Sequence, residues 1–214
     1  MRLVLASTSP RRKELLALLG LPFDIRSPDF EERIIPGRSA TDLVTSFARG
    51  KAQSVAAMDP EAVVLGSDTV IELDGTVLGK PRGLSEAETM LRRMAGREHL
   101  VHTAVSICCV ACALDRTEVS TARVRMNPDD AGRIDRYLAT GESLGKAGGY
   151  SIQGHGVELI SSLEGDFPTV VGLPLKLVAS MLTQAGFRVP VDVDHLYRTA
   201  SYGSWIRFRE APKA

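Results

Sequence analysis

The N-terminus of the chain holds the feature that most constrains its fold, a short buried strand that leads directly into a capped helix. Residues 3–6 have the sequence Leu-Val-Leu-Ala, and Ser9 followed by Pro10 places an N-cap residue and a first-turn residue where a helix should start. Leucines recur along the next turns, and Gly20 marks the end of the helix. A strand and a helix joined by so short a connection favour an α/β fold, in which helices cover a sheet.

The alternation of strands and helices continues along the chain. Ser39 and Asp42 form a pattern similar to a capping box, which predicts a second helix that ends near Met58. Asp74 and Gly75 predict the two-residue turn of a β-hairpin. We expect the other elements to be strands at 62–65, 70–73, 76–78, 101–114, 118–126 and 157–161 and helices at 85–95, 129–139 and 174–186.

The composition indicates one domain without a strong overall charge. The 214 residues are 44% hydrophobic, which is enough for one well-filled core and too little to require two comparable domains. Because the formal net charge is +0, nonspecific binding to nucleic acid or anionic membranes is not expected, and any anion site must be local. The first residues are too short an apolar run for a signal peptide, and no later run is long enough to span a bilayer, so we expect a cytoplasmic protein.

Three cysteines, Cys108, Cys109 and Cys112, lie in the apolar run that is predicted as a strand at 101–114. An odd spacing along a strand points Cys109 and Cys112 to opposite faces, whereas zinc and redox CxxC pairs need a turn. We therefore predict core thiols rather than a disulfide or a zinc site.

The first helix places two cations where the helix dipole disfavours them. Arg11 and Arg12 follow Pro10 in the first turn, next to the partial positive charge of the helix N-terminus. The interaction of each arginine with the helix dipole is unfavourable by on the order of 0.3–1 kcal/mol. A bound polyanion would make this arrangement favourable, because it would accept hydrogen bonds from backbone N–H groups, hydroxyls and guanidinium groups. We predict a phosphate site that extends from Ser7 to Arg12. The alternative is that both arginines are solvated or pair with carboxylates such as Glu14.

Lys51 lies on the apolar side of the second predicted helix, because Leu43, Phe47, Lys51 and Val55 recur at intervals of four residues. A lysine in such a stripe either extends its amine to water or meets an anion in a cleft. The sequence leaves both interpretations open.

Asp68 follows the predicted strand at 62–65, and ligands of open α/β sheets gather at the carboxyl ends of strands. Counting outward from the predicted hairpin turn pairs Thr69 with Lys80. Strict alternation then puts Thr69 and Lys80 on one face and Asp68 on the other, so joint action of Asp68 and Lys80 requires a bulge or a strand end. The alternative is a turn aspartate and a surface lysine with no shared role.

Three further residues have side chains suited to a nucleotide site. Glu31 and Glu32 could hold Mg²⁺ or Mn²⁺, which needs a few carboxylates and polarises a phosphoryl centre, or they could be solvated charges. Gln153 has an amide that could bind the edge of a base, or it could be a polar residue at a strand end. The glycine-rich segment 145–154 lacks the spacing of a Walker phosphate loop.

A series of short motifs stands in a fixed order along the chain. The motifs are Ala6-Ser7-Thr8-Ser9-Pro10-Arg11-Arg12, Glu32, Ala48 with Lys51-Ala52, Ser67-Asp68-Thr69, Gly79-Lys80-Pro81, Gly145-Lys146-Ala147-Gly148 with Tyr150 and Ile152-Gln153-Gly154, and Val170-Val171-Gly172-Leu173-Pro174. Taken together in this order, they closely resemble the Maf family over about residues 1–186. We assign these residues to one nucleotide pyrophosphatase domain and residues 187–214 to a C-terminal extension of unknown role.

The resemblance implies a two-lobed α/β fold, a mixed sheet with flanking helices and a long central cleft, similar to the inosine triphosphate pyrophosphatases. It also implies hydrolysis of a nucleoside triphosphate between its α and β phosphates, with a divalent metal cation, Mg²⁺ or Mn²⁺, as cofactor. By position, Asp68 matches the family's catalytic proton acceptor, and Glu32 together with Asp68 is expected to hold the metal. The residues that match the family's phosphate-handling positions are Ser7, Arg11, Arg12, Lys51 and Lys80.

The resemblance also bears on the base. Thr69 and Gln153 match the branch that prefers dTTP and UTP, whereas the 7-methyl-GTP branch tends to differ at both positions. The run Gly165 to Thr169 departs from the dTTP pattern, and Asp166 is closer to the other branch. We expect dTTP or UTP, with 7-methyl-GTP or another modified nucleotide as one alternative and a nucleotide-binding cell-division regulator without essential turnover as another. The oligomeric state stays open, with a homodimer as one alternative.

Overall fold

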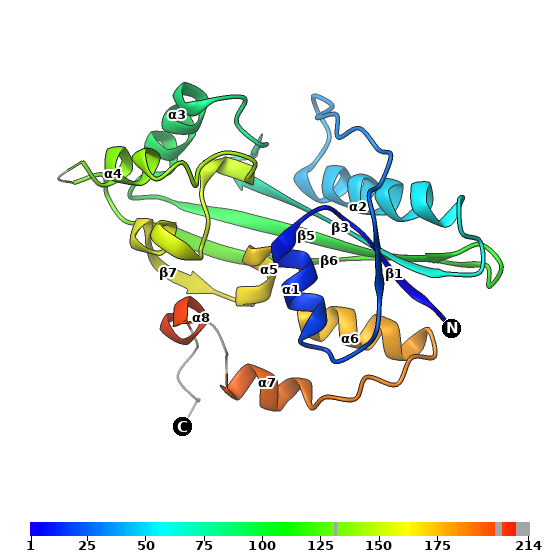
Figure 1. Cartoon of the computed structure of the whole chain (residues 1–214). Coiled ribbons are helices and arrows are strands. Elements are labelled where there is room, and N and C mark those ends of the chain that lie inside the picture. The colour runs from blue at the N-terminus through cyan, green and yellow to red at the C-terminus, as the bar shows by residue number, and fades with distance from the viewer. Residues whose placement is uncertain (131, 200–202, 209–214) are drawn as a thin grey trace.

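The computed structural model describes residues 1–130, 132–199 and 203–208 of the chain. Figure 1 shows helices packed around a long, twisted sheet. The strands are β1 (Leu3–Ala6), β2 (Asp24–Arg26), β3 (Val63–Leu73), β4 (Thr76–Leu78), β5 (Glu98–Cys109), β6 (Leu114–Met126) and β7 (Ile160–Glu164). The helices are α1 (Pro10–Ala17), α2 (Ala40–Ala56), α3 (Leu84–Met94), α4 (Arg133–Ala139), α5 (Phe167–Val171), α6 (Leu175–Gln184), α7 (Val193–Thr199) and α8 (Gly203–Arg207), with short 3-10 helices η1 (Ala147–Gly149) and η2 (Gly154–Leu159). None of the helices in these ranges is long and apolar enough to cross a membrane.

The strands form one mixed sheet in the order β2-β1-β3-β5-β6-β7, with β4 paired to β3. β1 is parallel to β2 and β3, whereas β3, β5, β6 and β7 form antiparallel pairs. The sequence predicts separate strands at 62–65 and 70–73, and this is wrong: residues 63–73 are one strand, because pairing with β5 continues without a break across the residues between the two runs.

Alternation along the strands decides which helices cover each face of the sheet. Leu3, Leu5 and Leu65 join the main core cluster, to which α1, α5 and α6 also contribute. Val4 and Val64 point to the opposite face and pack with α2. Figure 1 shows α2 and the pair of α3 and α4 toward opposite ends of the long strands, which gives the predicted two lobes.

Two helices begin at the caps that the sequence predicts. The Ser9 hydroxyl accepts a hydrogen bond from the Arg12 N–H at the start of α1. The Ser39 hydroxyl accepts one from the Asp42 N–H at 3.1 Å at the start of α2. These bonds satisfy N–H groups that have no partner within the helix.

The strand predicted at 101–114 ends early. β5 stops at Cys109, and residues 110–113 form the turn into β6, because the two long antiparallel strands require the chain to reverse here. Cys108 and Cys109 are buried and Cys112 is exposed, and all three are free thiols. The prediction of core thiols is therefore correct for two of the three cysteines and wrong for Cys112.

The C-terminal extension, for which the sequence predicts no element, contains α7 and α8 among its described residues. Trp205 of α8 is only 3% exposed, and its ring stacks on Phe167 of α5 with centroids 5.6 Å apart. The extension therefore contributes to the main core.

Candidate active site

The candidate site lies along one edge of β3, between the part that pairs with β1 and the part that pairs with β4. β1 pairs with one edge of β3 up to Ala6, opposite Gly66, and β4 pairs with the same edge from Leu78, opposite Ile71. Among the described residues, no strand covers this edge at residues 67–70, although these residues keep their partners on β5. The chain leaves the sheet after β1 to start α1, so a crevice opens at the carboxyl end of a parallel strand.

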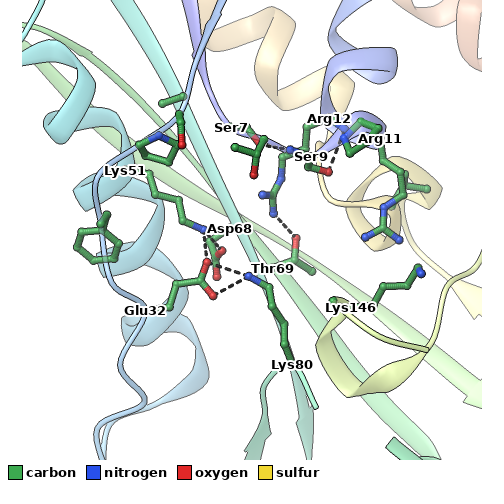
Figure 2. Close-up of a pocket in the computed structure, with 18 of the residues that line it drawn as sticks. Ser7, Ser9, Arg11, Arg12, Glu32, Lys51, Asp68, Thr69, Lys80 and Lys146 are labelled. Atoms are coloured by element: carbon green, nitrogen blue, oxygen red, sulfur yellow. Dashed lines mark hydrogen bonds and ion pairs between the residues drawn. The ribbon is translucent and has the colours of Figure 1, made fainter. Parts of the chain in front are cut away.

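A cavity of about 620 Å³ occupies this crevice. Residues 7–12, here called the arginine wall, form one side of it, and Figure 2 shows Glu32, Lys51 and Lys80 on the other side. The structure brings together all but one of the predicted site residues in the lining of this cavity: Ser7, Arg11, Arg12, Glu32, Lys51, Asp68, Thr69 and Lys80.

Arg12 is held by uncharged oxygen atoms. Its Nε donates to the Gly172 carbonyl oxygen at 2.9 Å, and its Nη2 donates to Thr69 Oγ1 at 3.3 Å. Ser67 Oγ donates to the same Gly172 carbonyl at 3.0 Å. The loop that follows α5 therefore fixes the direction of a guanidinium group without neutralising its charge.

Both arginines of the wall are left without an anionic partner. Among the residues that the structure describes, no carboxylate forms an ion pair with Arg11 or Arg12, so the predicted alternative of a pair with Glu14 is wrong. Burial lowers the pKa of both guanidinium groups, and the charge of Arg12 lowers that of Arg11 further. Two partly desolvated cations at a helix N-terminus favour an anionic ligand with several oxygen atoms.

The opposite side of the cavity contains the lysine–carboxylate cluster, which consists of Glu32, Lys51, Asp68 and Lys80. Lys51 Nζ lies 2.5 Å from Asp68 Oδ1 and 2.5 Å from Glu32 Oε1. Lys80 Nζ lies 2.9 and 2.8 Å from the two oxygens of Glu32. Lys51 therefore meets anions inside the cleft, at 6% exposure, instead of extending to water.

Gly66 explains how Lys51 reaches Asp68. A Cβ at Gly66 would lie 2.5 Å from the Ala48 carbonyl oxygen and 2.7 Å from the Ala52 nitrogen, both in α2. Only glycine lets α2 pack so closely on β3. Lys51 precedes Ala52, so the same close approach brings its amine to the strand.

Gly50 serves the loop that carries Glu32 in a similar way. The Phe30 ring lies over Gly50, where a Cβ would come within 2.1 Å of it, and it also packs on Phe47 with centroids 6.2 Å apart. The contact fixes the loop to α2 and so places the Glu32 carboxylate beside the lysines.

The two carboxyl groups of the cluster titrate in opposite directions. Burial raises the pKa of Asp68 above its ordinary value, although Lys51 and Arg12 act against this shift. Burial also raises the pKa of Glu32, but Lys51 and Lys80 outweigh it and bring that pKa down to about 2. Glu32 therefore stays ionised at neutral pH, whereas Asp68 has the higher proton affinity that a general base needs.

The predicted setting of Asp68 and Lys80 needs correction. Asp68 lies in the middle of β3 and not at a strand end, because β5 pairs with it at Ala104. Lys80 does not pair with Thr69, because β4 ends at Leu78. Asp68 and Lys80 are linked instead through Lys51 and Glu32, which no local count of strand register could show.

The positions of Gln153 and Lys146 relative to the cavity are not those that the sequence predicts. Gln153 does not line the cavity, although its neighbours Ser151 and Ile152 line a smaller one beside Arg11. Its role in base binding stays a prediction. Lys146 lines both cavities and was not predicted as a site residue; the signal that could have identified it is the lysine within the glycine-rich segment.

The carboxylates fit a divalent metal that shares its coordination with the substrate. Glu32 and Asp68 both contact Lys51, and the described residues contain no group of three or more acidic, histidine or cysteine side chains suited to a metal ion. Mg²⁺ typically binds one or two carboxylates together with substrate phosphates and water. The pair suits that arrangement and does not form a cage made of protein alone.

Comparisons with known proteins identify the family of the chain. The sequence model of the Maf family, described as Maf-like protein, matches residues 2–185. A dTTP/UTP pyrophosphatase of Anaeromyxobacter dehalogenans is 47% identical over 196 residues, which cover 88% of this chain and 96% of the relative. A 7-methyl-GTP pyrophosphatase of Xanthomonas campestris pv. campestris is 44% identical over 194 residues, which cover 88% and 98%. The solved structure of the Staphylococcus aureus Ham1 protein aligns with a TM-score of 0.46 and 15% identity, covering 76% of this chain and 81% of that one.

Proposed function

The chain belongs to the Maf-like protein family, and on that premise we propose that it is a nucleoside triphosphate pyrophosphatase, which hydrolyses the bond between the α and β phosphates. The observation that carries the proposal is the division of one cavity between two arginines, which form no ion pair with a carboxylate of the described residues, and a buried aspartate bonded to a lysine. The first side suits a triphosphate, and the second suits the activation of water.

On the arginine wall, we assign phosphate binding to Arg11, Arg12 and the hydroxyl of Ser7. The Gly172 carbonyl and Thr69, both within the protein, fix the direction of Arg12. Preorganised donors of this kind stabilise the charge that develops on phosphoryl oxygens without reorganising during the reaction.

In the lysine–carboxylate cluster, we assign the role of proton acceptor to Asp68. Its raised pKa improves its ability to take a proton from the attacking water, and Lys51 orients the carboxylate. Lys80 and Lys51 are placed to stabilise negative charge on the pyrophosphate that leaves. A divalent metal held by Glu32, Asp68 and the triphosphate would add charge neutralisation at the phosphoryl oxygens.

For the base, we propose dTTP and UTP as preferred substrates. Thr69 lines the cavity as the prediction for this branch requires, and the dTTP/UTP pyrophosphatase named above is similar over most of the chain. The relative named 7-methyl-GTP pyrophosphatase, with 44% identity, favours 7-methyl-GTP as the second candidate. We further propose that the enzyme acts in the cytoplasm on free nucleotides.

A substrate panel tests the proposal. The purified full chain is incubated with dTTP, UTP, CTP, 7-methyl-GTP and ITP, each with Mg²⁺ or Mn²⁺, and pyrophosphate is measured. We expect the highest kcat/KM for dTTP or UTP. Binding of these nucleotides without pyrophosphate release from any of them would overturn the enzyme assignment and favour a nucleotide-binding regulator.

A further inference from the structure

The C-terminal extension contacts the part of the chain that holds Arg12. The family match ends at residue 185, whereas α7 begins at Val193. Tyr197 of α7 packs against the main core, and its ring meets the edge of Trp205 with centroids 5.0 Å apart. Since Trp205 in turn stacks on Phe167, the extension lies directly against α5.

The Tyr197 hydroxyl connects the starts of two helices. It lies close to the carboxylate of Asp166, the N-cap residue of α5: burial raises the pKa of that carboxyl, and the Tyr197 hydroxyl acts against this shift. It also accepts a hydrogen bond from the Lys176 N–H at 3.3 Å, in the first turn of α6. The N-cap position of α6 is Pro174, which offers no side-chain acceptor. Tyr197 therefore supplies an acceptor that the start of α6 lacks.

The segment that Tyr197 fixes presents two carbonyl groups to the site. Gly172, between α5 and α6, accepts the hydrogen bond from Arg12 Nε at 2.9 Å. The Thr169 carbonyl of α5 accepts one from Thr103 Oγ1 at 2.7 Å, and Thr103 lies 2.9 Å from Thr69 Oγ1. Both paths end at the guanidinium group, because Thr69 Oγ1 accepts from Arg12 Nη2.

The Asp166 carboxylate links the hydroxyl of Tyr197 to these carbonyls. It accepts hydrogen bonds from the Thr169 N–H at 2.9 Å and from Thr169 Oγ1 at 2.7 Å. Ser120 Oγ, on β6, lies 2.7 Å from the same Thr169 hydroxyl. Hydrogen bonds therefore run from Asp166, which lies beside Tyr197 of the extension, through Thr169 to the residues that hold Arg12.

We propose that Tyr197 is a positioning residue, which holds the junction of α5 and α6 so that Gly172 and Thr69 keep Arg12 directed at the phosphate groups of the ligand. This role of Tyr197 rests on the proposed function, because it assumes that Arg12 binds a triphosphate. It gives the C-terminal extension a role in the site, although none of its described residues lines the cavity.

A double-mutant cycle tests the proposal with Tyr197→Phe and Arg12→Ala. Binding of inorganic triphosphate to the full chain is measured by calorimetry without metal. We expect Tyr197→Phe to weaken binding about threefold to tenfold in the wild-type background, which corresponds to the loss of one hydrogen bond, and less than twofold in the Arg12→Ala background. Asp194→Asn, which removes an exposed ion pair between α7 and Lys176 of α6, is the control and should change binding less than twofold.

The cycle separates positioning from general stabilisation. If Tyr197→Phe has the same effect in both backgrounds, or none in the wild type, the proposal is overturned. Asp166→Asn, which keeps the shape of the cap, is the second variant and should show the same dependence on Arg12. Release of pyrophosphate by the wild type is measured in parallel. If the effect of Tyr197→Phe depends on Arg12 but no pyrophosphate is released, Tyr197 keeps this role and the proposed function is rejected. If pyrophosphate is released but the effect does not depend on Arg12, the role of Tyr197 is rejected and the proposed function stands.

Discussion

The two sides of the cavity treat charge in opposite ways. On the arginine wall, Arg11 and Arg12 have no carboxylate partner among the described residues, and neutral oxygens hold Arg12 in place. In the lysine–carboxylate cluster, by contrast, both lysines are paired with carboxylates of the protein. An unpaired cation can bind an anionic ligand directly, whereas a paired one mainly tunes its partner.

The sheet itself produces this difference. Thr69 and Asp68 are neighbours on β3, so their side chains point to opposite faces. Thr69 meets α1 and the loop after α5, and Asp68 meets α2. One step along one strand therefore separates phosphate binding from acid–base chemistry.

The largest expected effect comes from Asp68→Asn, which removes the proposed base and leaves the arginine wall intact. We expect kcat/KM to fall by roughly 10² to 10⁴. We expect the fold to stay intact, because Lys51 keeps its second carboxylate partner, Glu32, in the variant. Steady-state kinetics and thermal unfolding check both points. Asp115→Asn, a surface aspartate paired with Arg49, is the control; full activity of Asp68→Asn would remove this residue from the mechanism.

Arg12→Ala tests the other side of the comparison. The loss of a charge-assisted contact of about 1.5–3 kcal/mol should weaken the binding of inorganic triphosphate by about 10- to 150-fold. Calorimetry measures this change. Lys13→Ala, an exposed cation on the same helix that does not line the cavity, should bind within about twofold of wild type. Equal losses in the two variants would mean that only the overall charge of α1 matters.

Gly66→Ala sharpens the comparison by disturbing the cluster through packing alone. The added methyl group meets backbone atoms of α2, so we expect the free energy of unfolding to fall by about 1–3 kcal/mol and turnover to fall with it, since Lys51 moves away from Asp68. Denaturant unfolding provides the measurement. Gly83→Ala, which meets nothing within 4 Å, serves as the matched glycine. Unchanged stability of Gly66→Ala would show that α2 does not need this close approach.

The smallest expected effect is a pH dependence of stability. The pKa of Glu32 is about 2 in the fold, below its ordinary value of 4.5, so its contribution is fully present above pH 4.5 and is lost as pH falls toward 2. The difference in free energy of unfolding between wild type and Glu32→Gln should therefore shrink over that range. Glu31→Gln changes an exposed pair with Arg33 and should show little such change. A difference that stays constant with pH would contradict the pairing of Glu32 with the lysines.

The sequence predicts the elements of the site better than their connections. The caps of α1 and α2, the register of the β3–β4 hairpin at Leu73 and Thr76, and the opposite faces of Asp68 and Thr69 are local properties, and all are confirmed. The features that the sequence predicts wrongly depend on contacts with residues far away in the chain.

Three features could not be derived from local patterns. Pairing with β5 extends β3 through Asp68, the packing of Phe30 on Gly50 brings Glu32 to Lys51, and α8 packs on α5 through Trp205 and Phe167. Each depends on contacts between residues far apart in the chain, which no spacing along one segment encodes.

The most direct test of the division of labour is the affinity of Asp68→Asn for dTTP, measured by calorimetry in the absence of turnover. The account predicts a Kd within about threefold of the wild-type value obtained under conditions without hydrolysis, because the substitution leaves the arginine wall unchanged. Loss of dTTP binding in this variant, with the fold intact, would contradict the account, because it would place phosphate binding in the lysine–carboxylate cluster.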